Sequence, residues 1–160
     1  MVGRQILIST ALMALATLGC FYHQALISIE PSSAAPALSS SERQAALAAI
    51  TPALEKLGFF PDPRLDDFAR IHRESPESTS LVVGAFRRHR DARPGNRIEV
   101  RAHVEKGTGK FVVLMTDYTF PFSTKFADQI EQAIAAALRK KFPNYEVHVE
   151  TRISGPNLGP

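Results

Sequence analysis

The chain has 160 residues, enough for one domain of ordinary size, and its 44% hydrophobic and 22% charged residues are the balance of a globular protein. Its formal net charge of +3 argues against a general nucleic-acid binder, because such a protein needs a wide basic field. The single cysteine excludes an internal disulfide, so the core alone must hold the fold.

The N-terminus has the pattern of an export signal. Arg4 precedes an almost uninterrupted apolar run, Ile6–Gly19, which ends at Cys20. A positive charge followed by an apolar segment and small residues is typical of a secretory signal, so we assign residues 1–19 to a signal peptide. The basic start favours a cytoplasmic N-terminus and an exported domain.

The residues Thr17-Leu18-Gly19-Cys20 resemble the lipobox of bacterial lipoproteins. In that family the cysteine is lipidated and becomes the mature N-terminus, so the resemblance implies a lipid on Cys20 and a cell-envelope protein with its domain on the periplasmic side. Two alternatives remain open. Ile6–Ile29 is long enough for an uncleaved single-pass membrane anchor, and an ordinary signal peptidase could cut after Ala37.

The segment after the signal predicts no regular structure. Glu30–Ser41 is rich in Pro, Ser and Ala and has no apolar period, so residues 20–40 are expected to be a membrane tether and flexible linker. A single domain over 41–153 follows. The last residues, 154–160, contain two Gly and two Pro and are expected to form a disordered tail.

The domain begins with a helix. A capping-box pattern at Ser39 and Glu42, or at Ser41 and Gln44, predicts its start, and Gly58 predicts its end. The apolar face continues across a proline at position 52, so we expect one kinked helix rather than two. In the proline-rich stretch that follows, the apolar spacing over residues 65–71 predicts a short helical turn.

Three strands are predicted next, over Leu81–Arg88, Arg97–Glu105 and Lys110–Thr119. The second alternates apolar and polar residues, and Lys106–Gly109 returns the chain as a hairpin. The third is apolar on both sides, which predicts partial cover on both faces. Together the three strands form an antiparallel meander.

A helix over Ser123–Phe142 and a strand from Tyr145 complete the domain. The helix has apolar residues at three- and four-residue spacing and is stopped by Pro143, and the strand then changes to a period of two. The order α-β-β-β-α-β predicts an α+β fold, a two-layer sandwich with both helices on one face and the last strand parallel to the third.

A basic run follows the first predicted strand. Guanidinium groups match phosphate oxygens, so the run could bind an anionic ligand such as a lipid headgroup or an acidic envelope polymer. The alternative is a solvated loop whose arginines pair with nearby acids and protect a strand edge. The candidate ligand-binding residues are Arg87, Arg88, Arg90 and Arg93.

Two further groups could carry chemistry. Asp117 ends a strand, where an acid is sometimes catalytic but more often bonds a loop or caps a helix. Histidines and acids also alternate on the polar face of the sheet, which is usual for a soluble face with cross-strand ion pairs. No metal-ligand spacing, serine-nucleophile, P-loop or dinucleotide motif occurs, so no metal or cofactor is expected. The polar-face residues are His103, His148, Glu99, Glu105, Glu146 and Glu150.

The sequence therefore favours a membrane-tethered envelope lipoprotein that acts as a non-enzymatic binding or structural module. Its expected partners are the membrane and either an envelope protein or an anionic envelope lipid or polymer, and no nucleic acid is expected. One alternative is a small hydrolase or metal-dependent enzyme that uses the His/Glu face. Another is a single-pass membrane-anchored subunit of an envelope complex.

Overall fold

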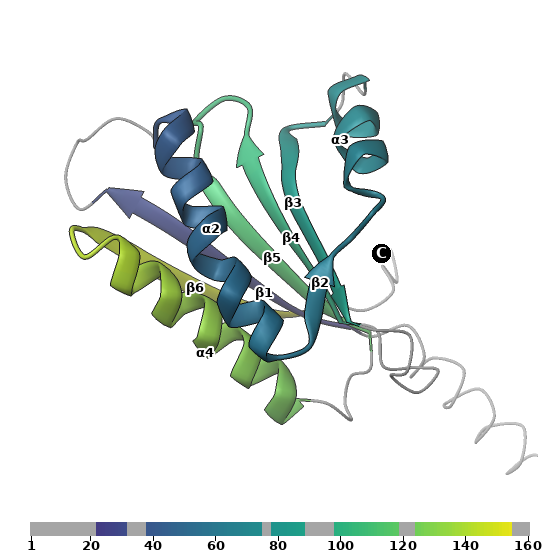
Figure 1. Ribbon diagram of the computed structural model, residues 1–160, viewed down its shortest axis with the longest axis vertical. Coiled ribbons are helices and arrows are strands. Elements are labelled where there is room, and N and C mark those ends of the chain that lie inside the picture. Colours follow the sequence, from purple (N-terminus) through teal and green to yellow (C-terminus); the bar gives the residue numbers. More distant parts are fainter. Residues whose placement is uncertain (1–21, 32–37, 75–77, 89–97, 119–123, 155–160) are drawn as a thin grey trace, which may run out of the picture.

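The computed structural model describes residues 22–31, 38–74, 78–88, 98–118 and 124–154. They form an α+β fold in which one six-stranded sheet carries two long helices on one face (Figure 1). The strand order is β2-β3-β4-β5-β1-β6, and every pairing is antiparallel. The predicted fold class is confirmed. The elements are β1 (Tyr22–Pro31), α2 (Ser40–Lys56), β2 (Phe59–Pro61), α3 (Leu65–Glu74), β3 (Ser80–Arg88), β4 (Ile98–Glu105), β5 (Phe111–Asp117), α4 (Thr124–Lys141) and β6 (Tyr145–Ser154).

The predicted meander is present as β3, β4 and β5, and α4 carries the chain over to β6. As expected, β6 runs in the same direction as β5. It does not pair with β5 or with β3, however. It pairs with β1, which lies between β5 and β6. The predicted order α-β-β-β-α-β was therefore incomplete, because it lacked β1, the short strand β2 and a full helix at α3.

Strand β1 corrects the prediction of a tether over residues 20–40. Residues 22–31 pair with β5 on one side and with β6 on the other, in a central position of the sheet. Ala25, Ile27 and Ile29 face the helices and are at most 2% exposed. Strand β1 also includes Tyr22–Ile29, the described part of the alternative anchor over Ile6–Ile29. The strand was missed because its apolar residues directly continue the apolar leader.

Two other expectations lie outside the described residues: the signal peptide over 1–19, with Cys20, and most of the tail over 154–160. Within the described ranges, no helix is long and apolar enough to cross a membrane.

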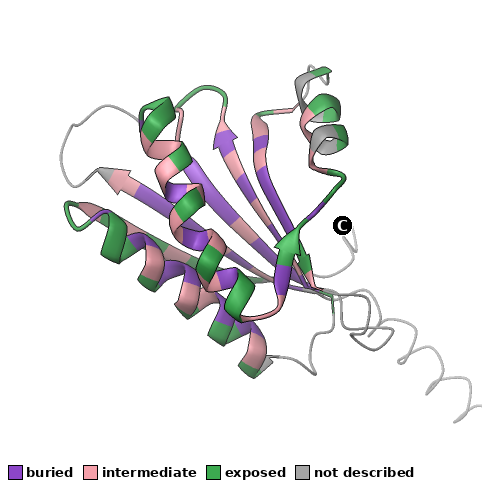
Figure 2. Ribbon diagram, in the orientation of Figure 1, coloured by how far each residue is buried: buried purple, intermediate pink, exposed green. Residues whose placement is uncertain are grey.

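The core lies between the sheet and the two long helices, which pack against each other across it (Figure 2). Strands β1, β4, β5 and β6 each contribute every second residue, as the alternation of β4 predicted. We call the other side of the sheet, which α2 and α4 do not cover, the outer face. The largest fully buried side chains are Phe59, Phe111, Ile27, Ile29, Ile50, Leu54, Met115, Ile130, Ile134, Leu138, Val100 and Val113.

Helix α2 begins and ends as its sequence predicts. The Ser39 hydroxyl accepts a hydrogen bond from the Glu42 amide (3.3 Å), and the Glu42 carboxylate accepts one from the Ser39 amide (2.8 Å). The helix continues through Pro52 as one element. Gly58 follows its end with φ of 81°, a left-handed conformation that favours glycine.

Candidate functional site

The two described members of the basic run lie at the end of β3 but point to opposite faces of the sheet. Arg87 is exposed on the outer face, in register with Phe60 and Glu99. Arg88 lies on the helix side, where its guanidinium carbon is 4.4 Å from the centroid of the Phe126 ring. This cation–π contact fixes Arg88 to α4 and gives it a structural role. Of the described pair, Arg87 is therefore the one available to a ligand.

The other predicted arginines, Arg90 and Arg93, lie outside the described residues. Their segment starts at Arg88 and ends at Ile98. Ile98 is in register with Asp117, which is in register with His23 at the start of β1. The end of β3, with Arg87 and Arg88, and the start of β1 therefore lie at the same end of the sheet (Figure 1).

Next to Arg87 lies an ion pair that sequence reasoning missed. Asp62 is 5% exposed and accepts hydrogen bonds from the Arg64 side chain at Nε (3.0 Å) and Nη2 (2.7 Å) and from the Arg64 amide (3.0 Å). These bonds hold the pKa of Asp62 below its usual value, with a smaller contribution from the charge of Arg87. Because the Asp62 carbonyl also accepts from the Leu65 amide, the pair fixes the turn into α3.

The His/Glu face does not converge into a site. His103, Val112, Ser28 and His148 lie in one row across β4, β5, β1 and β6. Three strand spacings, about 14 Å, therefore separate the two histidines, too far for one metal ion or one acid–base pair. Among the described residues, no group of three His, Cys, Asp or Glu side chains could hold a metal.

The acids of this face form local ion pairs instead. Arg101 bonds Glu99 at 2.7 Å along β4. Lys110 pairs with Glu30, and this hydrogen bond lowers the pKa of the Glu30 carboxyl. Such pairs are expected of a solvated strand surface.

Asp117 is fully buried on the helix side of β5, in register with His23 on β1. His23 is only 7% exposed, and its Nδ1 has no hydrogen-bond partner among the described residues. A carboxylate beside an imidazole can orient the ring for acid–base chemistry. Here the Asp117 carboxylate has no exposed surface for a substrate, which favours the structural role. Sequence reasoning missed His23 because it was assigned to the tether.

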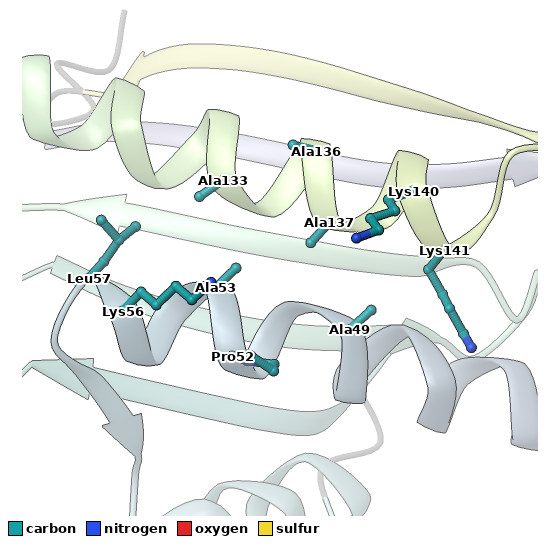
Figure 3. Close-up of a pocket in the computed structure, with 10 residues that line it drawn as sticks. All are labelled: Ala49, Pro52, Ala53, Lys56, Leu57, Ala133, Ala136, Ala137, Lys140 and Lys141. Atoms are coloured by element: carbon teal, nitrogen blue, oxygen red, sulfur yellow. The ribbon is translucent and has the colours of Figure 1, made fainter.

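A surface groove of about 660 Å³ lies between α2 and α4 (Figure 3). Five of its ten lining residues are alanines, and lysine side chains extend from both helices beside it. It contains no acid, histidine or hydroxyl group, so its lining supports apolar contact and attraction to anions rather than catalysis. The lining residues are Ala49, Pro52, Ala53, Lys56, Leu57, Ala133, Ala136, Ala137, Lys140 and Lys141.

Comparisons of the chain with protein-family models, with curated proteins and with solved structures find no match.

Proposed function

We propose that the chain is a membrane-tethered lipoprotein of the bacterial cell envelope, attached by lipid on Cys20, with a non-enzymatic binding or structural domain on the exported side. The observation that carries the proposal is the position of β1. The strand starts at Tyr22, two residues after Cys20, and is buried in the middle of the sheet. Processing at Cys20 removes the apolar leader and leaves this strand whole.

The two other ways of processing the N-terminus fit the fold less well. Cleavage after Ala37 would remove β1 and open the sheet between β5 and β6. A membrane span over Ile6–Ile29 would have to draw Tyr22–Ile29 out of the sheet. The apolar run that remains, Ile6–Gly19, is shorter than the ~20 residues that cross a bilayer. Both comparisons favour Cys20 as the boundary between leader and domain.

The binding function is proposed from the surface near the anchor. Arg87 is exposed at the sheet end where β1 starts, and Phe60 beside it is 44% exposed. Tyr118, one residue beyond the end of β5, is 49% exposed at the same end. Arginine and exposed aromatic rings suit the headgroup region of an anionic membrane. An envelope protein with an acidic surface is the other partner that this chemistry fits.

The mass of the native N-terminus tests the attachment. We expect the protein from a membrane fraction to carry a diacyl- or triacyl-modified Cys20, and the Cys20→Ala variant to lose the modification and keep its leader. An intact Met1, or an unmodified N-terminus near Leu38, would refute lipidation. Binding of a chain that begins at Phe21, which lacks both the leader and the lipid, to anionic vesicles tests the second part. It should weaken on Arg87→Glu and stay unchanged on Arg70→Glu, a control on α3.

A further inference from the structure

The two edges of the sheet are built differently. At one edge, β2 has only three residues and contains Pro61, and both features discourage pairing with another chain. At the other edge, β6 has ten residues, contains no Pro or Gly, and pairs with β1 without a register break. Among the described strands, β6 pairs only with β1, and its other edge carries no partner strand. A long, regular edge of this kind is a template for another strand.

The charges of β6 complement themselves. Consider a second β6 paired antiparallel with the first about a twofold axis at Val149. Each residue then lies opposite the residue that is equally far from Val149 on the other side. Glu146 then faces Arg152 of the second copy, and His148 faces Glu150. Both contacts occur twice because of the twofold axis. Opposite charges at directly opposed positions stabilise a pair of strands.

The neighbouring registers are less favourable. The helices of both copies stay on one face of the joined sheet only if the twofold axis moves by whole residues. A shift of half a residue would put the helices of the two copies on opposite faces. Centring on His148 would oppose Glu146 to Glu150, and centring on Glu150 would oppose two copies of that carboxylate. Like charges in opposed positions destabilise the pair. Among the three registers compared, the one centred on Val149 is therefore favoured.

The helix side of β6 also supports a partner. Val147 and Val149 pack on the core but stay half-exposed at the edge. In the centred register Val149 meets its own copy and Val147 meets Thr151. The strand is already held in place, since Tyr145 donates a hydrogen bond to Glu42 (3.0 Å) and Thr151 donates one to Glu131 (3.3 Å). A fixed edge loses little conformational freedom on pairing.

We propose that the chain forms a homodimer in which β6 pairs antiparallel with β6 of a second copy about a twofold axis at Val149. The two sheets then form one continuous sheet, with the helices of both copies on the same face. Within each copy Arg152 already bonds Glu150 at 2.7 Å, so dimerisation adds a second carboxylate, Glu146 of the other copy, to the same guanidinium. The inference does not depend on lipid at Cys20.

Sedimentation equilibrium of the purified full-length chain in detergent tests the dimer. We expect Arg152→Glu and Glu146→Arg each to raise the dimer dissociation constant by about tenfold or more, because each reversal opposes like charges at two places. The double variant Glu146→Arg/Arg152→Glu should restore the original constant. Asp67→Arg, an exposed reversal on α3, should change nothing. A chain that is monomeric at every concentration, or a dimer insensitive to both single reversals, overturns the proposal.

Cross-linking tests the register in a Cys20→Ser background. Two copies of Val149→Cys lie opposite each other, whereas two copies of Val147→Cys lie four residues apart along the strands, about 13 Å. A reagent shorter than that distance should join Val149→Cys dimers efficiently and Val147→Cys dimers poorly. The reverse result, or equal yields, overturns the register.

Discussion

The carboxylate of Asp62 is almost completely buried, and hydrogen bonds from Arg64 replace the water it has lost. Because the folded state lowers the pKa of this carboxyl, the pair contributes stability above the carboxyl's unfolded pKa. That contribution is lost as the pH falls through the lowered folded pKa. The pair is thus a source of acid-sensitive stability in the turn between β2 and α3.

Arg64→Gln should lower the free energy of unfolding at neutral pH by about 1 kcal/mol, a modest amount because the guanidinium is half-exposed and screened by solvent. The difference from the unchanged chain should shrink as the pH falls below about 4, where the unfolded carboxyl becomes protonated. Denaturant unfolding at several pH values measures both effects. Arg70→Gln, which loses only an exposed pair with Asp67, should be nearly neutral throughout. An Arg64→Gln effect that does not depend on pH would contradict this account.

At the scale of single elements, strong periodicity decided what could be predicted from the sequence. The apolar stripes of α2 and α4 and the alternation of β4 and β6 identified these elements to within a few residues. β2 was not predictable in this way, because its three residues become a strand only by pairing with β3. In the candidate site, the alternation of strand side chains predicts that Arg87 and Arg88 point to opposite faces of the sheet. The Asp62–Arg64 pair was not predictable, because it depends on a turn that no periodic pattern of residues marks.

Helix α2 contains a proline in its interior, where proline normally disfavours a helix. Pro52 lies in its interior, where it cannot donate a hydrogen bond to the carbonyl of Ala48. Pro52→Ala restores that donor, while the more flexible unfolded chain offsets part of the gain. We expect the free energy of unfolding to rise by about 1–2 kcal/mol, measured by denaturant titration. Lys56→Ala, exposed in the last turn, should change it little. A less stable Pro52→Ala variant would mean that the proline is needed for packing beside the groove.

At the scale of the whole molecule, β1 joins the two parts of the sheet. Without it, β6 and the β3–β4–β5 meander have no common partner. A chain that begins at Leu38 should therefore show no cooperative thermal unfolding by circular dichroism, whereas one that begins at Phe21 should unfold cooperatively. Equal melting of the two chains would show that β1 is dispensable, and cleavage after Ala37 would again be compatible with the fold.

The two proposals together constrain how the protein lies on a membrane. In the dimer the twofold axis runs perpendicular to the sheet, so the two β1 strands start at opposite ends of the shared sheet. Each Cys20 is only two residues from its strand, a reach of about 7 Å. Both lipids can then enter one bilayer only if the sheet lies along the membrane surface.

The position of β1 also sets the order in which the protein can be completed during synthesis. Tyr22 emerges from the ribosome well before its partner Ser154 is made. Pairings between residues this distant along the chain form slowly, because the entropy of closing a long loop is lost before the contacts of the pairing stabilise the chain. The sheet therefore cannot be completed until β6 has been made. For a protein exported as proposed, this delay leaves the sheet incomplete while the chain up to β6 is being made.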